Sequence, residues 1–255
     1  MSPTFVPLSY ERHGRLRLVA PTGTARFGHV GGMAAVAVCL AELDHVAHEF
    51  PLAFLPLPKG RLRLVGVLGA PGANLFVGPD GHWLGRYVPA VIRAYPFAWR
   101  RAPAGRATLY IDEASPLLSE QVGAPLFTSH GSLGEATARA AELVARLAQD
   151  IDATEAASSL LLHHGVLEPW TLPPLGQGTP AQGFLRVAEP RLRNLGPEAL
   201  HGLLQAGSLP LAYAQILSTP LLARLVEAAA RRRAPSATTP FDQSAADLRD
   251  LEFVF

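Results

Sequence analysis

The chain has 255 residues, a formal net charge of +1 from 22 basic and 21 acidic side chains, and 49% hydrophobic residues. This balance of charge produces no field strong enough to predict binding to nucleic acid or to an anionic membrane surface. The length allows one large domain or two small ones, and the apolar content is sufficient for a substantial core.

The cysteine content and the apolar runs bear on the compartment of the protein. Cys39 is the one cysteine, so an intrachain disulfide and a thiolate metal cage are excluded, and its small apolar neighbours predict that it is buried. The longest apolar run, Met33 to Ala41, is too short to cross a bilayer. The N-terminal residues lack the basic segment and apolar run of a signal peptide. We therefore expect a soluble cytoplasmic protein without a membrane span.

The first half of the chain is predicted to be rich in strands. Residues 15–20 alternate polar and apolar side chains as a strand does, whereas "AAVAVCLAELDHVAHEF" (34–50) predicts a helix that ends before Pro51. Buried strands are predicted in "PLAFLPL" and "LRLVGVLG", and a further strand over 106–113. The segment "GANLFVGPDGHWLG" predicts a hairpin, with Pro79 at the first central turn position and Gly81 at a positive φ.

The second half is predicted to be rich in helices. A helix of some thirty residues is expected from Ser132, with Ser132 and Glu135 as a capping box and Gly165 just past its end. A strand over 182–189 and a short helix over 196–207 follow. From Leu209 the chain is apolar and helical in pattern, with a break at Pro220.

These elements predict an α+β fold with a strand-rich N-terminal half, which includes an aromatic hairpin, and a helix-rich C-terminal half. Residues 1–233 are expected to form a single domain. Residues 234–255 are a Pro/Ser/Thr linker followed by an acidic tail with terminal aromatic residues. That tail is a candidate docking segment for a modifying-enzyme partner, or a clamp on its own chain.

No motif in the chain specifies a reaction. The pairs Glu42/His45 and Glu198/His201 have the Glu-x-x-His spacing of di-iron sites, but such sites also need two further glutamates on long helices. We favour surface or capping roles for both pairs and assign no metal and no cofactor. Ser132 is better explained as a helix cap than as a nucleophile, and no complete phosphate- or dinucleotide-binding loop is present. Catalytic residues stay unassigned.

The run "NLFVGPDGHWLGRYVPAVIRAYPF" resembles the signature of the SapC family of bacterial proteins. The pattern of that family is Asn-Leu-Phe, an Asp-Gly turn, Trp, Tyr-x-Pro-Ala, Ile-Arg and Tyr-Pro-Phe. The matching residues here are Asn74, Leu75, Phe76, Asp80, Gly81, Trp83, Tyr87, Pro89, Ala90, Ile92, Arg93, Tyr95, Pro96 and Phe97.

The resemblance extends over most of residues 5–225. It includes His13 in the opening segment, Glu42 before the "FPLAF" strand, Asp112 and Glu113 in "LYIDEAS", and the late segment "GSLPLAYAQILST". One position departs from the pattern, because Gln215 stands where the family pattern has His. That departure weakens a catalytic role for this late position.

The family name comes from an association with bacterial surface (S-) layers, and the peptide-transporter permease of the same name is excluded because this chain has no membrane span. Genes of the family are neighbours of flavin-dependent halogenases, cupin-like oxygenases and outer-membrane receptors. The resemblance therefore implies a role in the handling or modification of a peptide or another small metabolite.

The aromatic motif has two interpretations. Its rings can form a packed hairpin in which Arg93 pairs with Asp112 or Glu113, or the hairpin can form one wall of a ligand pocket. In the second interpretation Arg93 binds a carboxylate or phosphate and Asn74 is a polar anchor. The candidate ligand-binding residues are His13, Glu42, Asn74, Trp83, Arg93, Tyr95 and Asp112.

Three functions follow from these observations. The first, which we favour, is a non-catalytic protein that binds a peptide or metabolite and works with a modifying enzyme of the halogenase or oxygenase type. The second is an enzyme, metal-assisted or not, built around a polar centre of His13, Glu42 and Arg93. The third is a structural protein associated with the S-layer.

Overall fold

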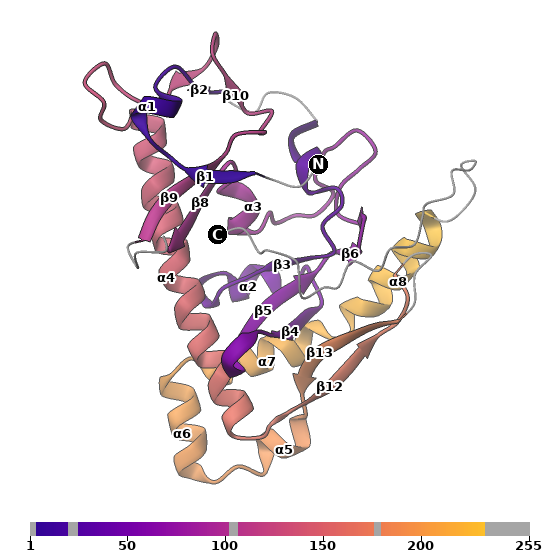
Figure 1. Cartoon of the computed structure of the whole chain (residues 1–255). Helices are drawn as coiled ribbons and strands as arrows, with labels where there is room; N and C mark the ends of the chain where they lie inside the picture. Colours follow the sequence, from indigo (N-terminus) through magenta and orange to yellow (C-terminus); the bar gives the residue numbers. More distant parts are fainter. Residues whose placement is uncertain (1–3, 20–24, 102–106, 176–179, 233–255) are drawn as a thin grey trace. The chain divides into compact units, whose positions relative to one another are not determined.

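The computed structural model describes residues 4–19, 25–101, 107–175 and 180–232 and confirms the α+β class (Figure 1). These residues form two compact units. Unit 1 contains the described residues up to Arg26 together with 90–149, and unit 2 contains 27–89 and 150–232. Each unit is described by itself, so the single domain expected over 1–233 stays a prediction. The predicted linker and tail lie outside the described residues.

Unit 1 contains two small antiparallel sheets. The first has the order β1-β9-β8, with β1 (Phe5–Pro7), β9 (Ala107–Asp112) and β8 (Phe97–Arg101). The second has the order β10-β2-β11, with β10 (Leu118–Ser119), β2 (Arg17–Leu18) and β11 (Ala124–Pro125). Unit 1 also contains two single-turn helices, α1 (Tyr10–His13) and α3 (Ala90–Arg93), and the Tyr95–Pro96 peptide between α3 and β8 is cis.

One face of the first sheet supplies the apolar core of unit 1. Phe97, Leu109 and Ile111 alternate with the residues of the other face, and all three are buried. The long helix α4 (Glu135–His163) also begins in this unit, and its residues from Asp150 onward belong to unit 2.

Unit 2 is built on a five-stranded antiparallel sheet of order β12-β13-β4-β5-β3 (Figure 1). Its strands are β3 (Ala35–Ala37), β4 (Leu52–Pro56), β5 (Leu62–Val67), β12 (Leu167–Leu172) and β13 (Ala181–Val187). A separate pair is formed by β6 (Gly69–Ala70) and β7 (Ala73–Asn74). Short 3-10 helices are η1 (Ala25–Val30), η2 (Leu40–Glu42) and η3 (Pro58–Gly60), and η2 leads into α2 (Leu43–Val46).

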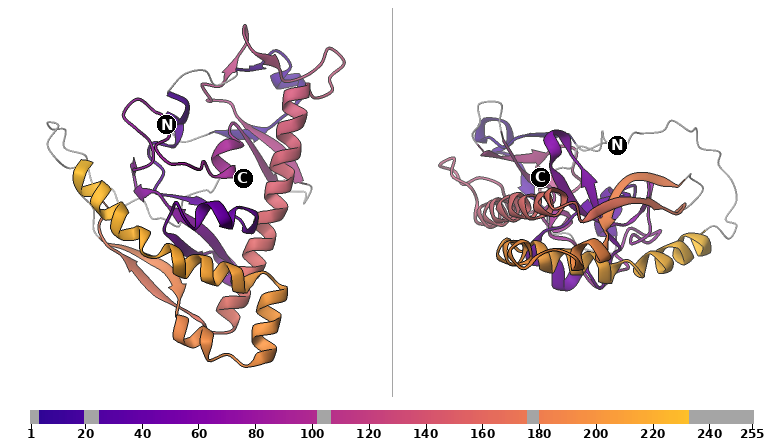
Figure 2. Two further views of the ribbon diagram at one scale, coloured as in Figure 1. Left: turned by 180° about the vertical axis from the view of Figure 1, so that it is seen from behind. Right: turned by 90° about the horizontal axis from the view of Figure 1, so that it is seen from below.

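Four further helices follow the sheet of unit 2. They are α5 (Glu189–Arg193), α6 (Pro197–Gln205), α7 (Ser208–Ser218) and α8 (Leu221–Arg232). Helix α7 lies next to β13 and β4, as both views show (Figures 1 and 2). Among the described helices no single one is long and apolar enough to span a membrane. Helices α7 and α8 together reach that length and apolar composition, but they are bent by 43° at their junction.

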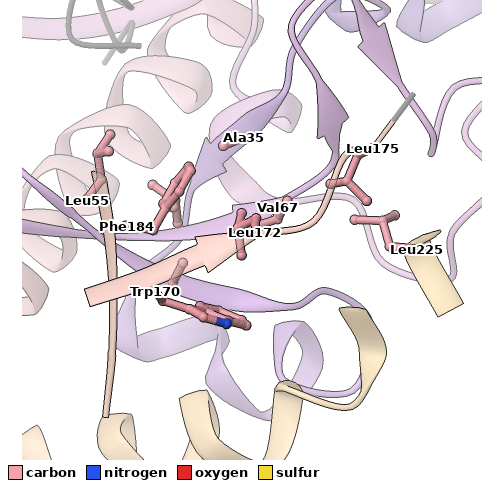
Figure 3. Packing of buried hydrophobic residues seen from close by; sticks show 10 residues of the cluster. Ala35, Leu55, Val67, Trp170, Leu172, Leu175, Phe184 and Leu225 are labelled. Atoms are coloured by element: carbon pink, nitrogen blue, oxygen red, sulfur yellow. The ribbon is translucent and has the colours of Figure 1, made fainter. Parts of the chain in front are cut away.

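The core of unit 2 lies over the sheet, where apolar side chains from distant segments meet (Figure 3). Phe184 of β13, Trp170 and Leu172 of β12 and Leu225 of α8 pack together in this cluster. Full burial of one such large apolar side chain contributes about 1.5–3 kcal/mol. The predicted strands at 51–57, 62–69 and 182–189 are confirmed because they supply this buried face.

Two of the local predictions are wrong. The helix predicted over 34–50 begins only at Leu40, because Ala35–Ala37 form β3 and pair with β5, where tertiary pairing overrides the helix propensity of alanine. Helix α4 begins at Glu135, so Ser132 is not its cap. Instead the carbonyl of Ser132 accepts a bond from the amide of Thr128 in a preceding turn.

Several local signals are confirmed. Gly81 has φ +80° and its amide donates to the carbonyl of Gly78, as the predicted turn requires, although the flanking strands shorten to one bridge between Val77 and Trp83. Gly165 follows α4 with φ +66°. Pro220 separates α7 from α8.

The seam between β13 and β4 is held by the side chain of Gln215. These two strands share the single register pair Leu185↔Phe54. Nearby, Oε1 of the buried Gln215 accepts from the amide of Val187 at 2.9 Å, and its Nε2 donates to the carbonyl of Leu52 at 3.1 Å. The side-chain amide of Gln215 thus supplies hydrogen bonds to both strands where they do not pair directly, and it links α7 to both strands.

We predict that Gln215→Ala lowers the free energy of unfolding by about 2–4 kcal/mol, because two buried backbone groups lose their partners at about 1–3 kcal/mol each. Urea unfolding followed by circular dichroism measures the change. Gln205→Ala, an exposed glutamine on α6, is the matched control and should change the value by less than about 0.5 kcal/mol. Equal unfolding of Gln215→Ala and wild type would refute a structural role for the bridge.

Candidate functional site

The candidate residues divide between the two units. His13, Arg93, Tyr95 and Asp112 belong to unit 1, and Glu42, Asn74 and Trp83 belong to unit 2. The convergence of His13, Glu42 and Arg93 therefore stays a prediction, and each half of the candidate set is described within its own unit.

Asp112 is the centre of the polar contacts at the end of β9. Its carboxylate is 3% exposed and accepts three hydrogen bonds: Oδ1 from the amides of Thr4 (2.9 Å) and Ala114 (3.2 Å), and Oδ2 from the hydroxyl of Tyr95 (2.9 Å). Burial is the main cause that raises the pKa of Tyr95 to about 12; a hydrogen bond with Ser115 opposes it, and the hydrogen bond and charge of Asp112 add to it. Asp112 thus fixes the start of β1, the turn after β9 and the Tyr95 ring together.

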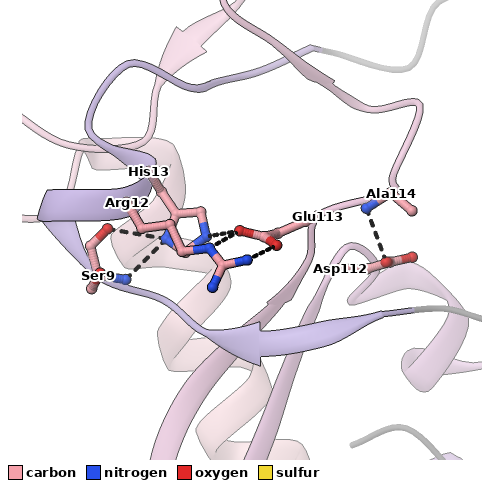
Figure 4. A network of polar contacts seen from close by, with 6 residues as sticks. All are labelled: Ser9, Arg12, His13, Asp112, Glu113 and Ala114. Atoms are coloured by element: carbon pink, nitrogen blue, oxygen red, sulfur yellow. Dashed lines mark hydrogen bonds and ion pairs between the residues drawn. The ribbon is translucent and has the colours of Figure 1, made fainter.

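His13 lies in the neighbouring network with Arg12 and Glu113 (Figure 4). The imidazole is fully buried, its Nε2 is 2.9 Å from Oε1 of Glu113, and its Nδ1 is 3.1 Å from the amide of Ser9. Nδ1 also lies 3.0 Å from the carbonyl of Ser9, so it accepts from the Ser9 amide or donates to the Ser9 carbonyl according to the tautomer. The guanidinium of Arg12 binds both oxygens of Glu113 and is the main cause that lowers the pKa of that carboxyl. Glu113 and Asp112 are thus engaged by groups other than the predicted partner Arg93.

Asn74, at the start of the aromatic motif, is buried and bonded on both sides of its amide. Nδ2 donates to the carbonyl of Val30 at 3.0 Å, and Oδ1 accepts from the amide of Phe76 at 2.8 Å. Its backbone carbonyl accepts from Nη1 of Arg232 at 2.9 Å. Asn74 therefore ties the segment before β3 to the corner that follows β7.

Glu42 is a buried carboxylate of unit 2. Oε1 accepts from the hydroxyl of Tyr87 at 2.8 Å, and Oε2 accepts from the amide and the thiol of Cys39 at 3.4 and 3.3 Å. Burial, and then the charge of Glu42, strongly raises the pKa of the Cys39 thiol, which keeps it protonated and unreactive. The exposed ring of His45 stacks on Tyr87 with centroids 4.7 Å apart.

Trp83 joins this region to the aromatic residues of unit 2. Its indole Nε1 donates to the carbonyl of Tyr87 at 2.8 Å, and its ring stacks on Phe76 with centroids 5.7 Å apart. Phe50 packs edge-on against both rings. The rings of Trp83 and Tyr87 are half-buried, so part of their surface stays open to solvent.

Sequence reasoning missed several charged residues whose side chains make long-range contacts within unit 2. Glu49 accepts from the amide of Arg86 at 2.8 Å, and the Arg232 guanidinium donates to the carbonyls of Asn74, Leu75 and Val77. The buried Arg63 pairs with Glu155 of α4 at 2.5 Å. These partners are 37 to 158 residues apart in the chain, so no local spacing could reveal them.

The described residues contain no group of three or more His, Cys, Asp or Glu side chains that could hold a metal ion. Glu198 and His201 lie on the nine-residue helix α6. A surface depression of about 300 Å³ lies at α5, between Glu189, Pro190, Arg193 and Asn194, and none of the candidate residues lines it.

We predict that one tyrosine releases its proton near pH 12 and that Tyr95→Phe removes this late component from the tyrosinate absorbance titration. The folded pKa of Tyr95 lies above the ordinary value of 10, so its contribution to stability is complete below pH 10 and is lost as the pH rises to about 12. Asp112→Asn should move the late component to lower pH, because it removes the anion beside the phenol. Identical titration curves for wild type and Tyr95→Phe would contradict the assignment.

Comparison with known proteins gives one match. The sequence model of the SapC family matches residues 8–225, which agrees with the range over which the motifs resemble that family. No curated protein and no solved structure matches the chain. Because the match covers most of the 255 residues, the chain belongs to the SapC family.

Proposed function

We propose that this chain is a non-catalytic binding protein that holds a peptide or small metabolite for a modifying enzyme of the halogenase or oxygenase type. The observation that carries the proposal is the hydrogen bonding of the buried carboxylates Asp112 and Glu42. All three hydrogen bonds of Asp112 and the contacts of Glu42 go to groups of the chain itself. A general base needs a lone pair that a substrate proton can reach, and these carboxylates are committed elsewhere.

The half-buried rings of unit 2 support a binding role. Trp83 and Tyr87 keep part of their surface open, and the exposed imidazole of His45 lies flat on Tyr87. Large rigid rings supply contact area at a low cost in conformational entropy, and bound rings stack on them favourably. The Trp83 indole donates to the carbonyl of Tyr87 and the Tyr87 hydroxyl donates to Glu42. These hydrogen bonds fix the two rings, so the surface is preorganised.

We predict that the immobilised full-length chain retains a subset of a synthetic octapeptide library and returns those peptides at unchanged mass. His45→Ala, which removes an exposed ring without opening the core, should weaken retention several-fold. Trp83→Ala should weaken it further. Tyr213→Ala, an exposed aromatic side chain on α7, is the matched control and should leave retention unchanged.

Two results would overturn this proposal. Peptides that return with an altered mass after contact with the chain alone would establish catalysis. Retention no greater than that of heat-denatured chain would remove the binding role. Circular dichroism of each variant separates loss of the ring from loss of the fold.

A further inference from the structure

The outer edge of β8 in unit 1 is open among the described residues. In the sheet β1-β9-β8, β8 pairs with β9 on one side and with no described strand on the other. The amide of Asp112 donates to the carbonyl of Pro96, which makes Phe97↔Ile111 a non-hydrogen-bonded pair. The backbone groups of Trp99, two residues on, therefore point to the outer edge. An open edge of this kind is a template for an added strand.

The two faces of the sheet differ in chemistry along this edge. One face carries Phe97, Leu109 and Ile111, which are buried and apolar. The other face carries the small buried Ala98 and then Arg100, whose guanidinium lies 5.1 Å from the ring centroid of Phe5 and 5.8 Å from that of Tyr110. A strand added beside β8 is thus favoured if its side chains alternate between apolar and anionic.

The Arg100 guanidinium is held in place but has no carboxylate partner among the described residues. Cation-π contacts with the two rings restrain the guanidinium, which lowers the entropy lost when a carboxylate binds. The overall charge of unit 1 also favours the binding of an anionic segment. Residues 1–26 and 90–149 contain ten arginines against six aspartates and glutamates.

The chain carries a segment with the required pattern at its C-terminus. Residues 236–255 contain Asp242, Asp247, Asp250 and Glu252 against the single cation Arg249. Within it, residues 250–255 read Asp-Leu-Glu-Phe-Val-Phe. In an extended strand side chains alternate, so Asp250 and Glu252 would project to one face and the apolar Leu251, Phe253 and Phe255 to the other.

We propose that the C-terminal segment of this chain docks on its own unit 1 as an added strand along the open edge of β8. The carboxylates of Asp250 and Glu252 then lie on the Arg100 face, and Leu251, Phe253 and Phe255 extend the apolar face. Seventeen residues separate Arg232 from Asp250, and an extended chain of that length spans up to about 55–60 Å at 3.3–3.6 Å per residue. Such a tether gives the segment an effective concentration of the order of millimolar at sites within its reach.

This inference does not depend on the proposed function, because its site lies in unit 1 and its ligand is part of the chain, whereas the proposed ligand contacts lie in unit 2. An extended partner peptide with the same alternation of carboxylates and aromatic residues would compete for the edge.

The test uses a fluorescein-labelled peptide of residues 245–255 and measures fluorescence anisotropy. A chain that ends at residue 235 should bind the peptide saturably, and the full-length chain should bind it at least tenfold more weakly because its own segment occupies the edge. Replacement of Asp250 by Asn and Glu252 by Gln in the peptide should weaken binding at least tenfold, a change that cannot unfold the protein. Arg100→Ala in the truncated chain should do the same, and Arg146→Ala, an exposed arginine of α4, should not.

Hydrogen exchange locates the site in the absence of peptide. The backbone amide of Trp99 should be protected in the full-length chain and should exchange faster in the truncated chain. Equal peptide binding by both chains, or binding that ignores the two carboxylates, would overturn the proposal. A full-length dimer that dissociates when residues 236–255 are removed would place the segment on a second copy and overturn docking on the same chain.

Discussion

The side-chain amide of Asn74 bonds two backbone groups that no strand of its sheet reaches, the carbonyl of Val30 and the amide of Phe76. Irregular backbone inside a protein must find such partners, because an unpaired buried amide or carbonyl costs about 1–3 kcal/mol. The described strands of this chain are short, and long segments between them are irregular. The need to pair that backbone governs where its buried polar side chains lie.

Both units meet this need in the same manner. Asp112 binds the amides of Thr4 and Ala114 in unit 1. In unit 2 the side chain of Gln215 bonds to both β13 and β4. The guanidinium of Arg232 donates hydrogen bonds to three backbone carbonyls at and after the end of β7. Asn74, a polar residue of the SapC motif that looked out of place among buried rings, supports the backbone in the same way. Such supports hold the two surfaces that we propose for recognition, the half-buried rings of unit 2 and the edge of β8 that is unpaired among the described residues of unit 1.

Local sequence signals predicted part of this structure. Alternation and apolar runs located β4, β5, β9 and β13, and the turn at Pro79–Gly81 and the end of α4 at Gly165 followed from residue chemistry. The helix expected over 34–50 was wrong in its first half because Ala35–Ala37 gain more from pairing with β5 than from helix propensity. The prediction that Ser132 caps α4 was wrong because the backbone of Ser132 belongs to an earlier turn.

The sequence predicted individual residues of the candidate site but not the contacts between them. Tyr95 and Asp112 were both named from the family motif, and they are in contact, but as partners of each other. The partnerships of Asn74 with Val30 and of Gln215 with Leu52 and Val187 join segments far apart in the chain, and spacing carries no information about them. Gln215 stands where the family pattern has His, yet its role is to complete a sheet.

The free energy of unfolding of Asn74→Ala tests most directly whether the buried polar residues of the family motif are structural. Removal of a group reserved for a ligand commonly leaves stability unchanged or raises it, since functional sites are held at a cost in stability. Removal of a backbone partner has the opposite effect. We expect urea unfolding to show a loss of about 2–4 kcal/mol for Asn74→Ala, because the carbonyl of Val30 and the amide of Phe76 lose their partner. An unfolding free energy equal to or above that of the wild type would contradict the account and mark Asn74 as a ligand-binding residue.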